Sequence, residues 1–230
     1  MVLDVGRSRR EIFPVQIGLF SFLIVGAYFL GSFPTGFLVA RALGIDLRTV
    51  GSGNIGATNA FRILGKGPGA TVLLVDALKG YTACLGLPWI VRSLGWVDPA
   101  ASPTFLEWMS ISAGVAAVLG HNYTCWLKFK GGKGIATSAG VLLALVPWAF
   151  LGVLVVFLIV FGLSRYVSLG SLAAAAFLPV ITWATGQSFT LIAMTSFLSA
   201  LAIYKHRANI SRLLKGTENR IGGKPGEVRK

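Results

Sequence analysis

Long apolar runs separated by short polar segments dominate the sequence. The runs at 12–40 and 69–91 are each long enough to cross the hydrocarbon core of a bilayer, which takes about 20 apolar residues in a helix. Comparable runs cover 105–126, 169–185 and 189–204. This pattern predicts an all-α membrane helix bundle.

The apolar run over 135–163 is too long for one comfortable helix, and Pro147 lies in its middle. Because proline breaks the helix that precedes it, we divide the run into spans at 135–146 and 147–163. The first of these is short, so a single long kinked helix is the alternative. With the division, the polytopic bundle has about seven transmembrane helices.

Hydrophobic residues make up 54% of the 230 positions and charged residues only 13%. A soluble globular domain usually carries about a quarter charged residues, so this chain has too little polar surface for one. We therefore expect a single membrane-embedded domain over 1–230, with an N-terminal extension at 1–11 and a basic tail at 222–230. Membrane lipids are its expected surroundings.

The 21 Lys and Arg residues outnumber the 8 Asp and Glu residues, and they gather in alternate loops. Basic clusters follow the first, third and fifth predicted spans and continue in the tail, at 41–66, 128–133, 165 and 205–230. Since basic short loops stay cytoplasmic, the N-terminus is predicted outside and the C-terminus inside. Arg7, Arg9 and Arg10 oppose this orientation, but the later bases outnumber them. A cleavable signal peptide would also explain them, although the first apolar run is too long for an ordinary signal core.

The scarcity of acidic residues limits the chemistry that the chain can support. Sites for Mg²⁺ or Mn²⁺ usually need clustered carboxylates, and the sequence has no such cluster. Cys84 and Cys125 lie in apolar stretches without CxxC spacing, which argues against a zinc site or a disulfide framework. We therefore expect no metal and no other cofactor.

The loop after the first predicted span carries GSGNIGATNAFR over 51–62. Its GxGxxG pattern lacks the βαβ setting of a dinucleotide site. Glycines such as Gly53 nevertheless let backbone N–H groups converge on an anion, a helix starting here would add its positive end, and Arg62 offers a planar fork for phosphate. Uncharged side-chain donors are supplied by Ser52, Asn54, Thr58 and Asn59. The alternative, a plain flexible loop, does not need so many donors around one arginine.

A second glycine-rich segment, FKGGKGIATS over 129–138, runs directly into the fourth predicted span. Leu127 stands where a Walker A loop requires glycine, so this is not a Walker A motif. Gly131, Gly132 and Lys133 could still hold a second phosphate beside a helix N-terminus. The alternative is a positive-inside anchor, which explains the lysines and leaves the glycines without a role.

Two further polar segments lie on the same predicted side. In KHRANISRLLKGTE over 205–218, His206 and Asn209 would share one helix face if the last span continues. A basic helix end resting on anionic lipid is the alternative. In RYVSLGS over 165–171, Ser168 taken alone is typical of a helix cap.

Two polar pairs lie in or near the spans. Asp76 and Lys79 are three residues apart within the second span, where charges are functional candidates by default. Mutual neutralisation is the simpler account, so we interpret them as a structural pair. His121 and Asn122, near the end of the third span, either contact the site or cap the span.

Taken together, GSGNIGATNAFR, FKGGKGIAT, RYVSLGS and KHRANISRLLKGTE resemble, in this order and spacing, the bacterial acyl-phosphate:glycerol-3-phosphate acyltransferases. The likeness covers about 30–221, with Thr124 where the family commonly has proline. It implies a seven-spanning enzyme of the bacterial inner membrane with a cytoplasmic active site. The implied reaction moves a fatty acyl group from acyl phosphate to the 1-hydroxyl of glycerol 3-phosphate. Its products are lysophosphatidic acid and orthophosphate, in the first step of phospholipid synthesis.

The same resemblance assigns roles to particular residues. It implies that the catalytic residues are Ser52, Lys133 and His206. It places the substrate-binding residues at Gly53, Asn54, Arg62, Gly131, Gly132, Ser168 and Asn209. The implied partners are the two substrates and membrane lipids, with no nucleic acid, and the oligomeric state stays open.

A site rich in Arg and Lys and poor in carboxylates suits two substrates that each carry a phosphate. The HxxxxD pair of other glycerol phosphate acyltransferases is absent, because Trp126 lies five residues after His121 and Ser211 five after His206. We therefore predict catalysis by positioning and charge stabilisation, with a substrate phosphate oxygen accepting the hydroxyl proton. The rival hypothesis is that His206 acts as a general base.

Two other functions fit parts of the pattern. A transporter for a phosphorylated solute would place its site near the bilayer midplane, usually between repeated halves. Here the motifs lie at span ends, and the sequence shows no internal repeat. A metal-dependent lipid phosphotransferase would need the acidic cluster that the sequence lacks.

Overall fold

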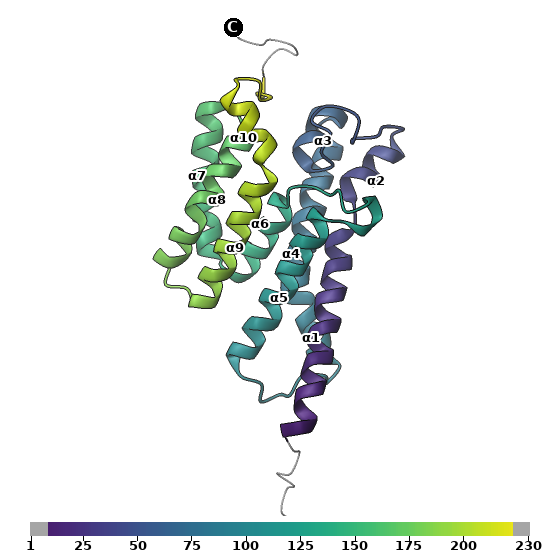
Figure 1. Cartoon of the computed structure of the whole chain (residues 1–230), viewed down its shortest axis with the longest axis vertical. Helices are drawn as coiled ribbons and strands as arrows, with labels where there is room; N and C mark the ends of the chain where they lie inside the picture. Colours follow the sequence, from purple (N-terminus) through teal and green to yellow (C-terminus); the bar gives the residue numbers. More distant parts are fainter. Residues whose placement is uncertain (1–8, 223–230) are drawn as a thin grey trace, which may run out of the picture.

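The computed structural model describes residues 9–222, and these form helices and connecting loops without a strand (Figure 1). The α-helices are α1 (Arg9–Ser32), α2 (Thr35–Ala42), α3 (Ala57–Leu64), α4 (Lys66–Ser93), α5 (Pro103–Asn122), α6 (Ile135–Leu145), α7 (Pro147–Ser164), α8 (Val167–Ala184), α9 (Phe189–Lys205) and α10 (Arg207–Leu214). A 3₁₀ turn, Cys125–Leu127, lies between α5 and α6. The predicted all-α class is therefore confirmed for this part of the chain. The predicted extension at 1–11 and tail at 222–230 fall mostly outside it.

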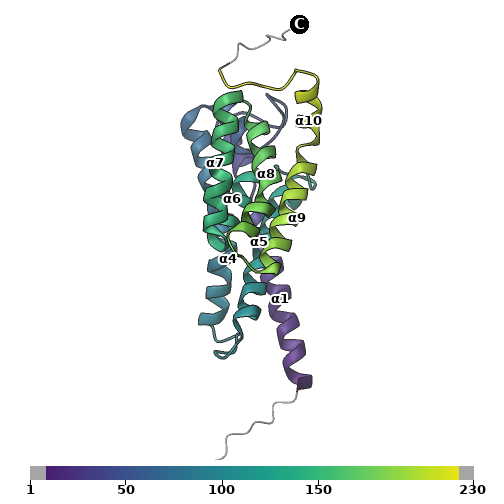
Figure 2. The same ribbon diagram turned by 90° about the vertical axis from the view of Figure 1, so that its left-hand side faces the viewer.

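The helices form two groups that meet along α4 and α6. In the first group α1 packs along α5, with α4 beside both; in the second α8 packs between α7 and α9. Figure 2 shows the second group from its own side, with α10 continuing beyond α9. The contact between α4 and α6 joins the groups, so residues from both can face one another at the end where α3 and α10 lie (Figure 1).

Several of these helices are long and apolar enough to cross a membrane. By length and composition four described segments qualify: Gly18–Ala42, Lys66–Ser93, Pro147–Ser164 and Val167–Ala184. A fifth is reached if α9 and α10, which are bent by 55° at His206, count as one broken span. The chain is accordingly a multi-pass membrane protein, whereas the predicted count of seven remains a hypothesis.

The helix boundaries agree with the apolar pattern at most positions and differ at two. The division at Pro147 is confirmed, because α6 ends at Leu145 and α7 begins at the proline. The first predicted span contains two helices: it breaks at Phe33 and Pro34, where proline cannot donate a backbone hydrogen bond, although Gly18–Ala42 still qualifies as one span. The third helix ends at Asn122, four residues earlier than predicted, because the chain then turns back on itself.

Thr124 is built into this turn. Its hydroxyl donates a 2.6 Å hydrogen bond to the carbonyl of Ser32, next to the break between α1 and α2. The side chain is fully buried. This hydrogen bond thus fastens the start of the loop to the end of α1.

Small residues let the main helices approach closely, as is common where helices pack in membranes. Where α4 crosses α6, the Cα of Gly140 lies against the backbone of Ala77 and that of Gly80 against the carbonyl of Thr137. Side chains at these glycines would collide with backbone atoms, which cannot rotate away. The crossing that joins the two groups therefore depends on glycine.

We expect the substitution Gly140→Ala to destabilise the fold by about 1–3 kcal/mol, because an added methyl group overpacks this crossing. The matched control is Gly162→Ala in α7, where no atom outside the helix lies within 4 Å of the added carbon. Thermal unfolding in detergent should show a lower Tm for the first variant and an unchanged or higher Tm for the second. Equal Tm values would show that the crossing is looser than described.

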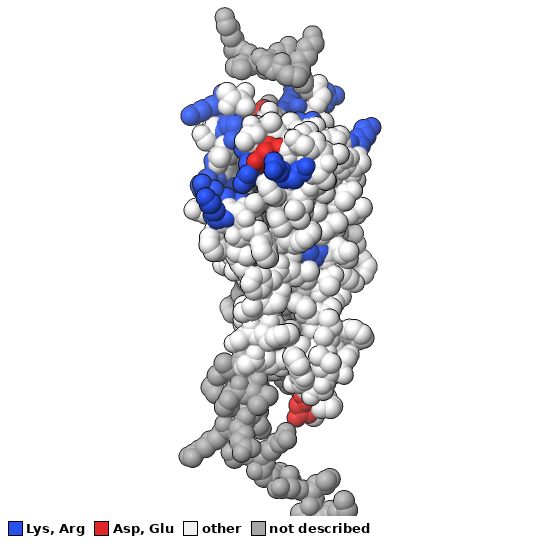
Figure 3. All heavy atoms as spheres, turned by 90° about the vertical axis from the view of Figure 1, so that its right-hand side faces the viewer, with Lys and Arg blue, Asp and Glu red and all other residues white. Residues whose placement is uncertain are grey.

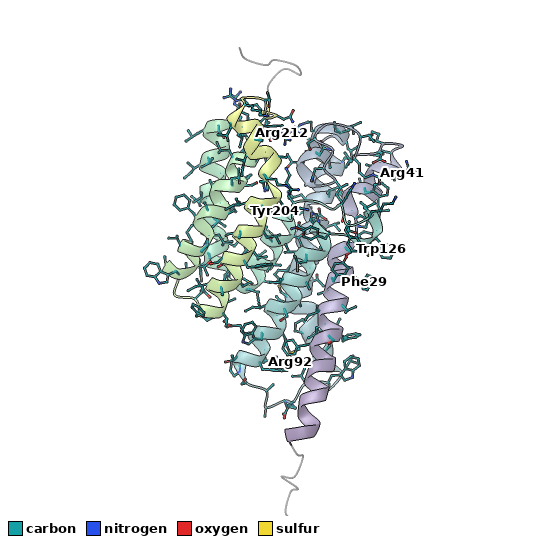
Figure 4. All side chains as sticks on the ribbon, in the orientation of Figure 1. Phe29, Arg41, Arg92, Trp126, Tyr204 and Arg212 are labelled. Carbon is teal, nitrogen blue, oxygen red and sulfur yellow. The ribbon has the colours of Figure 1, made fainter. Side chains whose placement is uncertain are left out.

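Charge is distributed unevenly along the long axis of the molecule. Figure 3 shows the Lys and Arg side chains concentrated at the end that carries α2, α3 and α10. In Figure 4, Arg41 and Arg212 lie toward this end, whereas Arg92 lies toward the opposite one. The segments that the sequence singled out as basic therefore meet in space.

Candidate active site

Two adjoining cavities lie at the basic end of the bundle. The first encloses about 170 Å³ and the second about 250 Å³. Both are lined by Ser52, Asn54, Lys133 and Asn209. The first adds Arg62, Ser168 and His206, and the second adds Gly53, Gly131 and Gly132. The structure thus brings all ten predicted site residues to the lining of two neighbouring cavities.

The first glycine segment is shaped by Asn59, which the sequence suggested only as a ligand donor. Its side-chain oxygen accepts a hydrogen bond from the backbone N–H of Ser52 at 3.0 Å. Its amide nitrogen donates to the carbonyls of Leu47 and Val50. The side chain is 2% exposed, so Asn59 holds the loop and is not free to bind a ligand.

A helix does start within this segment, as expected. α3 begins at Ala57, so its first backbone N–H groups lie beside the first cavity, which Ala57 and Thr58 line. Arg62 lies one turn further along α3 and lines the same cavity half-buried. The positive end of a helix and a guanidinium group thus act on one space, a combination that favours an anion.

The second glycine segment folds back onto the end of α5. The N–H of Gly131 donates to the carbonyl of Asn122 at 3.3 Å, and that of Gly132 donates to the carbonyl of His121 at 3.1 Å. These two N–H groups therefore hold the loop and, in this conformation, do not point at a phosphate. The glycines are needed for a different reason, because a Cβ at either position would collide with His121 or its neighbour.

Lys133 is the member of this segment that reaches across the site. Its ammonium group donates a 2.5 Å hydrogen bond to the side-chain oxygen of Asn209 in α10. α6 then begins at Ile135, after Gly134 has turned the chain with a φ of 80°. The lysine and the start of a helix lie next to each other, as the sequence predicted.

The third segment is not a continuous helix. α9 ends at Lys205 and α10 starts at Arg207, with a bend of 55° between them. The last span does not continue unbroken, so the condition under which His206 and Asn209 would share one helix face is not met. Both side chains nevertheless line the first cavity, because the bend turns α10 over the site.

Glu218 is a site residue that the motif analysis did not single out. One carboxylate oxygen accepts hydrogen bonds from the hydroxyl of Ser168 at 2.9 Å and the side-chain amide of Asn209 at 2.7 Å. The other oxygen accepts from Nε of Arg212 at 2.6 Å. Ser168 is the second residue of α8, not its cap. The sequence did contain a signal for this residue, because Glu218 is the single acidic residue in the basic segment 205–218.

Comparison with known proteins decides the family. The sequence profile of the family described as Glycerol-3-phosphate acyltransferase matches residues 21–216. The chain belongs to the glycerol-3-phosphate acyltransferase family. A relative of that name from Geobacter sulfurreducens is 47% identical over 195 residues, which cover 85% of this chain and 94% of the relative. Another, from Thermosynechococcus vestitus, is 43% identical over 92% of this chain and 98% of the relative.

Two solved structures of PlsY (YgiH), an integral membrane glycerol 3-phosphate acyltransferase, are also similar. The glycerol 3-phosphate form is 41% identical with a TM-score of 0.77, covering 88% of this chain and 96% of that one. The lysophosphatidic acid form is 39% identical with a TM-score of 0.75, covering 88% and 95%. The acyltransferase therefore shares a fold with both.

In the described part of the acyltransferase, possible metal ligands do not gather. Among residues 9–222, no group of three or more His, Cys, Asp and Glu side chains is placed to hold a metal ion. Cys84 is buried and Cys125 half-buried, and neither is in a disulfide. The polar groups that line the cavities are amides, hydroxyls, basic side chains, two imidazoles and the carboxylates of Asp76 and Glu218.

Burial sets the charge states of two residues in the acyltransferase. It is the main cause that lowers the pKa of Lys133 to about 8, with Glu218 opposing the shift and the neighbouring bases adding to it. Burial, followed by the charge of Lys133, lowers the pKa of His206 to about 4. At pH 7 the lysine is therefore a cation and the histidine is neutral.

The lowered pKa of Lys133 gives an expected pH profile. As pH rises through about 8, the free enzyme loses the lysine charge, so kcat/KM for acyl transfer should fall there. Bound phosphate favours the cation, so the fall in kcat should lie at higher pH. Profiles of both parameters, compared with those of Lys133→Arg, check this. A wild-type kcat/KM that stays level to pH 10 would contradict it.

Proposed function

We propose that this protein transfers a fatty acyl group from acyl phosphate to the 1-hydroxyl of glycerol 3-phosphate, giving lysophosphatidic acid and orthophosphate. The observation that carries the proposal is the convergence of four separate motifs on one joined, basic cavity pair in a member of this acyltransferase family. The similarity to a structure whose protein is described in a glycerol 3-phosphate form supports the acceptor.

Two anionic phosphates must be brought together in this reaction, and the cavities are equipped for that. Arg62 faces the first cavity, Lys205, Arg207 and Arg212 face the second, and Lys133 lines both. Fixed donors in a site partly shielded from water stabilise developing charge more strongly than water does. The shared lysine can act on both phosphates.

The bond changes then follow from the chemistry of a mixed anhydride. The hydroxyl oxygen of glycerol 3-phosphate attacks the acyl carbonyl carbon, and the bond from that carbon to the phosphate oxygen breaks. Orthophosphate leaves with the electron pair of this bond, and a phosphate oxygen takes the hydroxyl proton. The protein contributes position and positive charge.

His206 is suited to orient the hydroxyl and is poorly suited to remove its proton. Its Nδ1 lies 2.8 Å from the carbonyl of Ala202, which accepts a hydrogen bond, so Nδ1 carries the hydrogen and Nε2 presents a lone pair. An effective general base has a pKa near the working pH, whereas the pKa of His206 is lowered to about 4. We infer that Nε2 accepts a hydrogen bond from the substrate hydroxyl.

The membrane setting is part of the proposal. One domain over 1–230, with an extension at 1–11 and a tail at 222–230, would cross the inner membrane of a bacterium about seven times. The N-terminus would lie outside, and the basic end with both cavities would face the cytoplasm. The concentration of Lys and Arg at the cavity end supports this orientation (Figure 3).

The proposal is tested with purified protein, palmitoyl phosphate and glycerol 3-phosphate. Orthophosphate and lysophosphatidic acid should appear in equal amounts, and palmitoyl-CoA should not replace the donor. Omitting either substrate is the control for hydrolysis. An enzyme that forms lysophosphatidic acid only from palmitoyl-CoA would overturn the proposed donor, and one that forms none would overturn the function.

A further inference from the structure

A cluster of three buried polar side chains lies beneath the cavities. Asp76 and Lys79 belong to α4 and His121 to α5, and their exposed fractions are 2%, 5% and 6%. The ammonium group of Lys79 lies 2.9 Å from the carboxylate of Asp76. The predicted pair is thus present, but it has a third member, because the same ammonium lies 2.9 Å from Nδ1 of His121.

The ammonium group of Lys79 fixes the hydrogen on the imidazole. An ammonium has three N–H donors and cannot accept. Its three neighbours at hydrogen-bond distance are the Asp76 carboxylate, the carbonyl of Phe33 at 3.1 Å and Nδ1 of His121. Nδ1 must therefore present its lone pair, which leaves the hydrogen of the neutral ring on Nε2.

The Nε2 edge of His121 lies at the glycine segment and the first cavity. Gly132 precedes Lys133 and lies directly against Nε2. A Cβ at this glycine would collide with the imidazole. His121 lines the first cavity together with Lys133 and Gly134. Both contacts of the ring with Lys79 and Asp76 are made by Nδ1, and within residues 9–222 Nε2 is not one of the fully enclosed polar atoms. Because His121 lines the first cavity, the hydrogen on Nε2 can be donated to a group bound there.

Asp76 has a second function in the cluster. Its carboxylate also accepts a 3.1 Å hydrogen bond from the hydroxyl of Thr35, which ties α4 to the start of α2. Because the ion pair with Lys79 balances its charge, a carboxylate can line the first cavity without repelling an anion there. The pair thus holds His121 in place and keeps the floor of the cavity close to neutral.

We propose that His121 is a further substrate-binding residue, which donates its Nε2–H to a phosphate oxygen of a bound substrate. Lys79, held by Asp76, is a positioning residue that keeps the hydrogen on Nε2. The identity of the ligand rests on the proposed function, while the tautomer rests on the contacts of Lys79 alone.

Two substitutions of His121 by side chains of similar size distinguish the loss of a hydrogen-bond donor from a change in packing. His121→Gln keeps an N–H donor near the place of Nε2, whereas His121→Leu removes it. We expect Leu to raise KM for one of the two substrates by roughly tenfold to a hundredfold, the range for a hydrogen bond to a charged group, and Gln by less than about threefold. Varying each substrate in turn shows whose phosphate is bound. An equal effect of Gln and Leu would overturn the proposal.

A spectroscopic test does not depend on turnover. The chain has two histidines, so His206→Gln leaves His121 as the only ¹⁵N-labelled imidazole. Solid-state NMR in lipid at pH 7 should show a protonated Nε2 and an unprotonated Nδ1, with the Nε2 signal moving when glycerol 3-phosphate or an unreactive alkyl phosphonate is added. A protonated Nδ1, or an Nε2 signal that neither ligand moves, would overturn the proposal.

The control for both experiments is Tyr28→Phe. It removes the 2.8 Å hydrogen bond from the Tyr28 hydroxyl to the carbonyl of Tyr123, at the same loop but outside both cavities. Its KM values should equal those of the wild type. A wild type without turnover counts against the proposed function, while the NMR result on the tautomer stands by itself.

Discussion

Replacing Arg62 by methionine is expected to lower kcat/KM for acyl transfer by about 100- to 1,000-fold, the usual loss when one preorganised donor to a transition-state charge is removed. Arg62 lines the first cavity from α3 and is half-buried there, so water replaces its charge poorly. Arg62→Lys keeps a charge and loses the planar fork, and it should fall between the wild type and methionine. Steady-state kinetics with both substrates measures this.

The control for Arg62 is Arg48→Met in the same loop region. Arg48 is exposed and paired with Asp46, and it lines neither cavity. Removing one positive charge there should change kcat/KM by no more than about twofold, because exposed charges are screened. If both variants lost activity equally, the effect would come from net charge at the basic end and not from a contact made by Arg62.

His206→Gln is expected to raise KM for glycerol 3-phosphate by roughly tenfold while most of kcat is kept, because we propose that Nε2 of His206 binds the substrate hydroxyl and does not remove its proton. Its lowered pKa of about 4 also means that the wild-type profile should show no His206 ionisation between pH 5 and pH 8. Saturation curves for glycerol 3-phosphate at several pH values provide the measurement.

The competing hypothesis makes the opposite forecast for His206. If His206 were a general base, the substitution His206→Gln would lower kcat by a factor of about 100 or more with little change in KM. Asn209→Asp serves as a comparison, because it replaces the amide that bonds to Lys133 and Glu218 and should disturb binding through charge. A collapse of kcat alone in His206→Gln would decide for the general base.

Most of the fold could be predicted from the sequence, because the length of an apolar run and the position of a proline are local properties. Pro147 marked the boundary between α6 and α7, and the helix starts beside both glycine segments were correct. The break at Phe33 was missed because the apolar run continues through it. The bend at His206 was missed because that segment stays compatible with a helix in composition.

The residues that line the cavities were easier to predict than the hydrogen bonds among them. Glycine, base and amide types at the four motifs identified what lines the cavities. Which N–H groups remain free depends on tertiary contacts, and those of Gly131 and Gly132 are used by the end of α5. The link between Lys79 and His121 joins residues 42 positions apart, a distance over which spacing gives no information.

The cavity residues run from Ser52 to Asn219, so the last described helix and the segment after it complete the lining of the cavities. A chain still being inserted, with α10 not yet placed, has most of its apolar helices and no closed anion pocket. If these cavities are the active site, as we propose, acyl transfer is expected to begin only after the final segment has docked against α8 through Glu218 and Ser168. Enzyme activity therefore reports completed biogenesis, and a cleavage or fusion point chosen before Glu218 would leave a membrane-inserted but inactive protein.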